Sequence, residues 1–204
     1  MQQALARHSL NLNVDKCVAQ TNWREASLEP LVINGQKLPM VSAFEGFKVL
    51  GTQVTLLGRC SAEIRARVAA AWGKFHYLWP VLGKRNGSLQ KRLRLFDATI
   101  SQTILWCCES WLITQKEKQL IKTTQNAMLR RIAGSRRRPD EDWVGWIQRS
   151  TRTALMHARA ANVRIWLDFQ LRSKYSWAGH VVRMDGARLA HRALRWRDSE
   201  WWAT

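Results

Sequence analysis

Cysteine and long uncharged runs are both scarce in this 204-residue chain. The 4 cysteines, at positions 17, 60, 107 and 108, show no paired spacing, so neither a disulfide framework nor a zinc cluster is expected. The N-terminus lacks the apolar core of a signal peptide, and the longest uncharged run, near residues 98–108, is too short to span a bilayer. We therefore expect free thiols and an intracellular location, with the nucleus as a candidate compartment.

Catalytic motifs are also missing. The sequence contains no nucleophile elbow, phosphate-binding loop, HExxH or Cys-x-x-Cys pattern. The trio Asp140-Glu141-Asp142 has no distant carboxylate or histidine partner, and we interpret Asp140 as the N-cap of a helix that carries Trp143. His180 is expected to be packed in the core and not to act as a ligand or base. No catalytic residue, metal site or cofactor is predicted for this chain.

Acidic residues are few relative to basic ones. The chain has 33 Lys and Arg against 15 Asp and Glu, a net charge of +18, and the excess extends over both halves. A charge of this size favours an anionic partner, with nucleic acid first and an anionic membrane surface second. The chain is also rich in tryptophan, with 12 residues. Helical spacing places Trp72, Trp79 and Trp166 in a core, whereas the terminal Trp201-Trp202 pair either docks on the body or is exposed.

Helical periodicity dominates the sequence after residue 60. Apolar residues three or four apart predict one helix over Ile64–Leu82 and a second over Leu89–Cys107, joined as a hairpin. Ser88 is placed to cap the second helix, and Pro80 should kink or end the first. Four further helices are expected: Glu117–Ile132 with Gly134 as its C-terminal stop, one that begins at Asp140, Thr151–Ala161 before a break at Asn162, and Val163–Met184 with Trp166, Phe169, Trp177 and Val181 facing inward.

A small β-rich region precedes these helices. Asn34-Gly35, flanked by Leu31-Val-Ile33 and Gln36-Lys-Leu38, is a strong hairpin signal because both turn positions need positive φ. A second strand pair is expected within Phe44–Val54, and residues 2–10 are a short helical candidate. The predicted fold is therefore mainly α, a multi-helix bundle with a small N-terminal β-hairpin region.

The densest positive charge lies at the end of the helix that stops at Gly134. Three adjacent arginines repel one another and gain most from a polyanion, which favours phosphate contact. The alternative is that the first two complement the helix dipole and the others form a solvated loop. The cluster consists of Arg130, Arg131, Arg136, Arg137 and Arg138.

Six short strings occur in one order along residues 10–184. They are Leu10-Asn-Leu-Asn13-Val-Asp-Lys16, Phe47-Lys-Val-Leu-Gly51, Glu63-Ile-Arg-Ala-Arg67, Ile104-Leu-Trp-Cys-Cys-Glu-Ser-Trp111, Leu129-Arg-Arg-Ile-Ala-Gly134 and Trp177-Ala-Gly-His-Val-Val-Arg-Met184. Together they resemble the C-terminal part of non-LTR (LINE-type) retrotransposon reverse transcriptases. Ser9, Cys17 and Val49 depart from the Gly, Thr and Tyr usual in that family.

The resemblance implies an organisation into three parts. Residues 1–58 would be the end of an α+β palm, with apolar surface exposed, residues 59–135 a thumb-like helical unit, and residues 136–204 a C-terminal helical region. A primer-grip-like hairpin would include Phe47, Lys48, Leu50 and Gly51. The residues expected to hold a nucleic-acid backbone are the five arginines of the cluster together with Lys84, Arg85, Lys91, Arg92 and Arg94. For Lys91, Arg92 and Arg94, the alternative is the solvated face of an amphipathic helix.

The family's catalytic Tyr-x-Asp-Asp lies upstream of its Leu-Asn segment, and Met1 of this chain comes after it. Mg²⁺ is therefore expected only for the complete parent enzyme. We expect a non-catalytic C-terminal fragment of a reverse transcriptase that binds RNA or DNA, as a duplex and without sequence preference, and that lacks a membrane span. The alternative is an independent basic, Trp-rich helical module that binds RNA, a membrane surface or a protein.

Overall fold

The computed structural model describes Ser9 and residues 12–21, 31–33, 35–41, 46–55 and 60–195. For residues 193–195 it describes the backbone only. The expected helix over residues 2–10, Asn34 of the predicted turn and the Trp201-Trp202 pair lie outside the described residues. The chain divides into two compact units, Met1–Ala66 and Arg67–Thr204. The divisions near residues 58 and 135 stay predictions.

Short strands form three pairs in the described part of the first unit. The predicted hairpin is confirmed, and Gly35 in its turn has φ of +77°. The second predicted pair is also confirmed, as an antiparallel hairpin whose register joins Phe47 to Val54. The strands are β1 (Ala19–Gln20) parallel to β4 (Met40–Val41), β2 (Val32–Ile33) antiparallel to β3 (Gln36–Lys37), and β5 (Phe47–Val49) antiparallel to β6 (Thr52–Val54), after a 3₁₀ turn η1 (Val14–Lys16).

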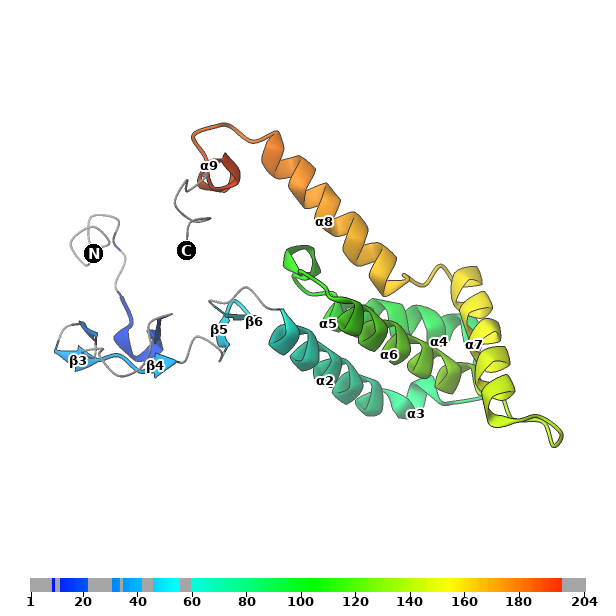
Figure 1. Cartoon of the computed structure of the whole chain (residues 1–204). Helices are drawn as coiled ribbons and strands as arrows, with labels where there is room; N and C mark the ends of the chain where they lie inside the picture. Colours follow the sequence, from blue (N-terminus) through cyan, green and yellow to red (C-terminus); the bar gives the residue numbers. More distant parts are fainter. Residues whose placement is uncertain are drawn as a thin grey trace. The chain divides into compact units, whose positions relative to one another are not determined.

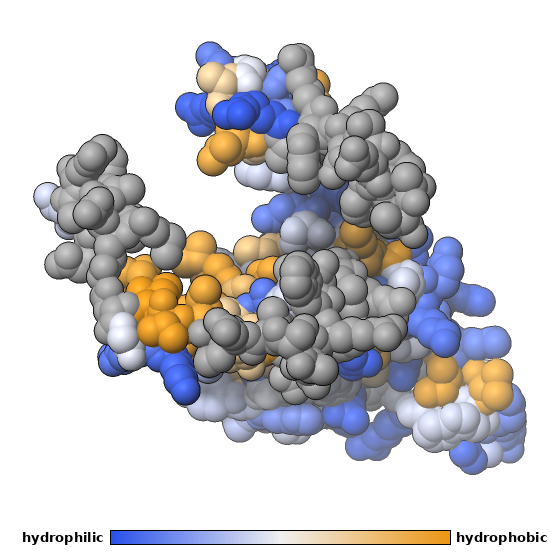
Figure 2. All heavy atoms as spheres, turned by 60° about the vertical axis from the view of Figure 1, so that its left-hand side comes forward, coloured by the Kyte–Doolittle hydropathy of each residue, from blue (hydrophilic) through white to orange (hydrophobic). Residues whose placement is uncertain are grey.

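Little apolar surface is buried by these strands. Among the described residues from 12 to 55, Leu38 is the one buried apolar side chain, whereas Leu31 and Val32 are about half exposed and Leu50 is 91 % exposed. Apolar side chains are visible at the surface in Figure 2. The exposed apolar surface expected for residues 1–58 is therefore present in the part that the structure describes.

The first long helix ends where the sequence predicts. α2 (Ser61–Tyr77) stops before Leu78, and a single turn, α3 (Trp79–Leu82), follows with Pro80 in its first positions. Proline lacks the N–H that a continuous helix would need there, although it fits the first turn of a new one. Trp72 is half-buried and Trp79 is 39 % exposed, so the expectation that both are core residues is wrong for Trp79.

The second helix of the hairpin is shorter than expected. It consists of α4 (Leu89–Phe96), a π turn η3 (Asp97–Ser101) and α5 (Gln102–Ile104), before a 3₁₀ turn η4 (Cys108–Ser110). The Ser88 hydroxyl accepts from the Lys91 N–H at 3.5 Å, as predicted. Cys107 adopts φ of +54°, which no continuing right-handed helix allows, and Cys108 is the buried thiol. The prediction that the helix extends to Cys107 is therefore wrong.

The next two helices pack against each other. α6 (Gln115–Ala133) begins with a capping box between Thr114 and Glu117 and ends at Gly134, whose φ of +67° confirms the predicted stop. α7 (Trp143–Ala160) is one helix where two were predicted, since no glycine or proline interrupts it near Thr151. Its N-cap is Asp142 and not Asp140: the Asp142 carboxylate accepts from the N–H groups of Val144 and Gly145.

The last long helix, α8 (Trp166–Val182), is buried at its start and exposed toward its end. Trp166 is fully buried, stacks on Phe96 with ring centroids 5.8 Å apart, and donates from Nε1 to the Ser101 hydroxyl at 2.8 Å. Trp177 is 49 % exposed and His180 is also exposed, so the prediction that both lie in the core is wrong. A short helix, α9 (Leu189–Arg195), follows.

Within the second unit, α6 lies against α4, α7 and α8 (Figure 1). These contacts bury a core of Leu, Ile, Phe and Met side chains from α4, α5 and α6, closed by Ala154 and Ala158 of α7. The predicted fold class is confirmed: the protein is mainly α, with small two-stranded sheets. Of the helices that the structure describes, none combines the length and the apolarity needed to cross a bilayer.

Candidate functional site

Two basic segments that are distant in sequence meet at the C-terminal end of α6. The guanidinium of Arg85, in the turn between α3 and α4, lies against Gly134: a Cβ at Gly134 would be 3.5 Å from both Nε and Nη2 of Arg85. Gly134 supplies the left-handed conformation that ends α6, and a Cβ at this distance would be in ordinary van der Waals contact with Arg85. Lys84, also exposed, is therefore brought to the same end of the unit as the arginine cluster.

Arg92 fastens this end of the bundle. Its Nη1 atom donates to the carbonyl oxygens of Leu82 and Ile132, both at 2.8 Å. These carbonyls belong to the last turns of α3 and α6, where helix geometry leaves backbone acceptors without an intrahelical partner. The half-buried Arg92 therefore joins two helix ends, and we do not count it among the candidate phosphate ligands although the sequence placed it there.

The last turn of α6 carries two adjacent cations. The Arg131 guanidinium lies over the Trp72 indole, 4.9 Å from the ring centroid, and its side chain is exposed. Arg130 donates from Nη1 to the Thr151 hydroxyl at 3.0 Å. Burial, and secondly the charge of Arg131, lower the pKa of Arg130 from its usual value. An anion placed between the two arginines would relieve this unfavourable electrostatic environment.

The loop after Gly134 exposes the other three arginines on a fixed backbone. Arg149 makes a bidentate ion pair with Glu141, with both N···O distances 2.7 Å, and its Nη2 also donates to the Arg136 carbonyl at 2.9 Å. The Arg138 N–H donates to Glu141 as well. Hydrogen bonds from Arg149 lower the pKa of Glu141 to about 2. Glu141 therefore orders the loop, while the side chains of Arg136–Arg138 extend into solvent.

An exposed indole lies next to these arginines. Trp143, the first residue of α7, is 61 % exposed and pairs with Trp146 at a centroid separation of 4.8 Å. Trp146 donates from Nε1 to the Ser135 carbonyl, which fixes the pair beside the loop. The sequence pattern contains no signal that Trp143 is exposed.

We call this surface the basic end. Its charged side chains come from the α3–α4 turn, the last turn of α6 and the following loop. Arg85 of the turn lies against Gly134 at the end of α6, and hydrogen bonds to Thr151 and from Arg149 of α7 hold the last turn of α6 and the loop. Lys91 and Arg94 are exposed on α4, and their part in the interface stays a prediction. The basic end consists of Lys84, Arg85, Arg130, Arg131, Arg136, Arg137 and Arg138.

The primer-grip-like residues lie in the β5–β6 hairpin of the first unit. Leu50 and Gly51 form its turn with φ of +49° and +84°, the two consecutive positive values of a type I′ turn. Lys48 is exposed and Phe47 is half-buried. Glu63, at the start of α2, accepts from the Gln53 N–H at 2.7 Å and so ties the hairpin to the helix. A role in gripping a primer stays a prediction.

No cluster of three or more His, Cys, Asp or Glu side chains is placed to hold a metal ion within the described ranges. Two carboxylates of the 140–142 trio have other partners: Glu141 binds Arg149, and Asp142 caps α7. The four cysteines are free, and burial raises the pKa of the Cys108 thiol to about 11, which keeps it protonated near neutral pH.

Comparisons with known proteins give two similar sequences. An uncharacterised transposon-derived protein of Caenorhabditis elegans is 26 % identical over 161 residues, which cover 74 % of this chain and 52 % of that protein. The outer capsid protein VP2 of Rice ragged stunt virus is 28 % identical over 132 residues, or 58 % of this chain and 11 % of that protein. The chain thus spans about half of the first relative and a small part of the second. It matches no protein family model and no solved structure.

Proposed function

We propose that this chain is a transposon-derived, post-catalytic part of a non-LTR retroelement reverse transcriptase, and that its basic end holds the backbone of a template–primer duplex. The single observation that carries the binding proposal is the convergence of seven Lys and Arg side chains from three separate segments at one end of the helical unit. Duplex backbone binding needs such clustered cations and no base-reading side chains.

The similarity to the transposon-derived protein of C. elegans supports the origin. The six strings in family order support the type of element, and four of them lie in or after the helical hairpin. The exposed apolar residues of the β-hairpin region support a further point: in the parent enzyme, this region packs against the remaining palm.

A salt titration of duplex binding tests the proposal. A labelled template–primer duplex is titrated with the 204-residue chain, and its anisotropy is followed at several salt concentrations. The logarithm of the affinity should fall linearly with the logarithm of the salt concentration, by roughly 0.9 for each phosphate contacted. Two duplexes of unrelated sequence should bind equally. An affinity that is undetectable or independent of salt would overturn the proposal.

The proposal that this chain is a post-catalytic part of the enzyme also predicts that the 204 residues have no polymerase activity. DNA synthesis needs carboxylates that hold two Mg²⁺ ions at the primer end, and the matched strings belong to the part of the family that follows those carboxylates. We expect no primer extension with Mg²⁺ and deoxynucleotides, measured by gel electrophoresis beside an active reverse transcriptase as the positive control. Incorporation by the purified chain would contradict the assignment.

A second candidate function is an independent module that binds an anionic membrane surface. The exposed Trp143 and Val144 beside three arginines favour it, because an apolar tip flanked by cations also suits a lipid headgroup layer. Binding to vesicles that contain anionic lipid, compared with duplex binding at the same salt concentration, separates the two candidates. Tighter binding to vesicles would favour the membrane module.

A further inference from the structure

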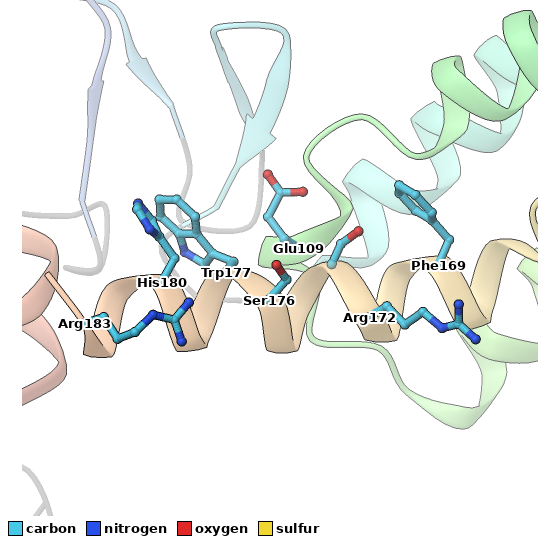
Figure 3. A pocket seen from close by; sticks show the side chains of 8 residues that line it. Glu109, Phe169, Arg172, Ser176, Trp177, His180 and Arg183 are labelled. Atoms are coloured by element: carbon cyan, nitrogen blue, oxygen red, sulfur yellow. The ribbon is translucent and has the colours of Figure 1, made fainter.

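A groove runs along the exposed side of α8, away from the residues assigned to the basic end. Its volume is about 760 Å³, within the range of small-molecule sites. Glu109 of η4 forms one wall, and α8 side chains three or four residues apart form the other. Figure 3 shows Trp177 and His180 on the same side of the helix as Glu109, whereas Arg183 and Arg172 lie along the near face of α8, Arg183 toward His180 and Arg172 toward Phe169.

The groove explains a string of residues that the basic end does not use. Trp177, His180 and Arg183 of the Trp177–Met184 string all line it. Gly179, between them, is needed for a different reason: a Cβ there would lie 3.3 Å from Arg183 Nη1, which is closer than most Cβ contacts in proteins. The absent side chain therefore lets the Arg183 guanidinium fold back along α8. One spacing pattern thus places an aromatic ring, an imidazole and a guanidinium on one wall.

The wall opposite α8 is held in place by hydrogen bonds. Gln170 Nε2 donates to the Cys108 carbonyl at 3.2 Å, and Lys174 Nζ donates to the Trp111 carbonyl at 3.5 Å. These bonds fix η4, and with it Glu109, beside the helix. Trp177 remains 49 % exposed although it packs against His180, with ring centroids 5.6 Å apart. A large indole is therefore presented to solvent in a preformed groove that the Arg183 side chain also lines.

We propose that this groove binds one nucleotide unit with an unpaired base. The base stacks on Trp177, the Arg183 guanidinium contacts the phosphate, and the Glu109 carboxylate accepts a hydrogen bond from a sugar hydroxyl or a base amino group. A base within a duplex has no free face for the indole, so the unit comes from a single strand or from a free nucleotide. The lining carries two arginines against one glutamate, which suits an anionic ligand.

This inference does not depend on the proposed duplex binding, because the two sites share no residue. The test uses anisotropy with a fluorescently labelled single strand of about eight nucleotides, within the site sizes known for single-strand binders. Trp177→Ala should weaken binding roughly 5- to 150-fold, the usual effect of removing one stacking aromatic. Tyr175→Ala is the matched control, since Tyr175 is 70 % exposed on the same helix and does not line the groove. Equal affinities for the wild type and both variants would overturn the inference.

A second variant tests the role of Arg183 without weakening the helix. Gly179→Leu fills the space of the Arg183 guanidinium with a good helix former, so it should lower affinity for the single strand while thermal unfolding shows a helix at least as stable as in the wild type. Unchanged affinity in this variant would contradict the role of Arg183. Blunt duplex binding should be unchanged in both Trp177→Ala and Gly179→Leu, and a parallel loss there would show that the effect is not specific to the groove.

Photo-crosslinking locates the ligand and identifies its source. A single strand that carries 5-iodouracil should form an adduct on Trp177, mapped by mass spectrometry, and adducts confined to the basic end would overturn the inference. The same measurement with 5-iodouridine monophosphate distinguishes the two sources. An adduct from the mononucleotide at the same nucleotide concentration assigns the groove to free nucleotides, and an adduct from the strand alone assigns it to a single-stranded segment.

Discussion

Replacing Arg136, Arg137 and Arg138 together by glutamine is expected to lower duplex affinity roughly 10²- to 10³-fold near 0.1 M salt. The three side chains are exposed, and each phosphate contact that is lost should also reduce the slope of log affinity against log salt by about 0.9. Anisotropy titrations at several salt concentrations measure both quantities. The loop backbone is held through the Arg136 carbonyl and the Arg138 N–H, which the substitutions keep, so the fold should be unchanged.

A second triple variant removes the same charge elsewhere. Arg159 is exposed on α7, Arg188 just before α9 and Arg192 on α9, all outside the basic end. Their replacement by glutamine lowers the net charge equally, so it controls for long-range attraction of a polyanion. The slope should then change little. Equal losses of affinity in the two triple variants would show that net charge alone attracts the duplex, and that the basic end is not a specific binding surface.

Arg92→Met is expected to lower the free energy of unfolding by about 2–4 kcal/mol, the combined size of two hydrogen bonds from a charged donor less what water recovers. The substitution keeps most of the side-chain volume but leaves the Leu82 and Ile132 carbonyls without the guanidinium that joins them. Urea unfolding followed by circular dichroism measures the change, with the slope of the transition as a check that both proteins unfold in the same way.

Arg94→Met serves as the matched control for Arg92→Met. Arg94 is exposed on the same helix, and surface substitutions of this kind usually change stability by less than about 0.5 kcal/mol. If Arg92→Met were as stable as the wild type but bound the duplex more weakly, Arg92 would be a phosphate ligand, as the sequence suggested, and its role as a link between helix ends would be refuted.

Local signals in the sequence predicted the helices well where a chemical device marks the boundary. Pro80, Ser88 and Gly134 each act through their own backbone or hydroxyl, so the structure confirms all three boundaries. Apart from the N-cap of α7, which is Asp142 and not Asp140, the failures lie where a boundary depends on contacts. The helix ends at Cys107 although no glycine or proline stands next to this residue. The π turn is likewise not indicated by the periodicity of the sequence. In it, the Thr99 hydroxyl donates to the Leu95 carbonyl at 2.7 Å.

In the candidate site, too, the sequence predicted local features and missed those that depend on contacts. The sequence predicted the arginine cluster as a charge pattern, but it could not predict that Arg85 packs on Gly134, because that contact depends on how α3 and α4 turn back onto α6. Arg92 looked like its neighbours on α4, and only the packing distinguishes it from Arg94. Burial of α8 was overestimated because its apolar residues, such as Trp177, keep helical spacing past the point where α8 stops contacting α6.

The bidentate pair between Arg149 and Glu141 affects how the arginines of the loop bind a partner. Because the loop backbone is ordered before any partner arrives, its conformational entropy is not lost on association, and the arginines meet a polyanion in a preorganised array. The pKa of Glu141 near 2 means that the pair loses its stabilising effect only in strong acid, as the pH falls from the range of an unperturbed glutamate toward that value. Across neutral pH, encounter with a polyanion is therefore governed by ionic strength and not by protonation of this loop.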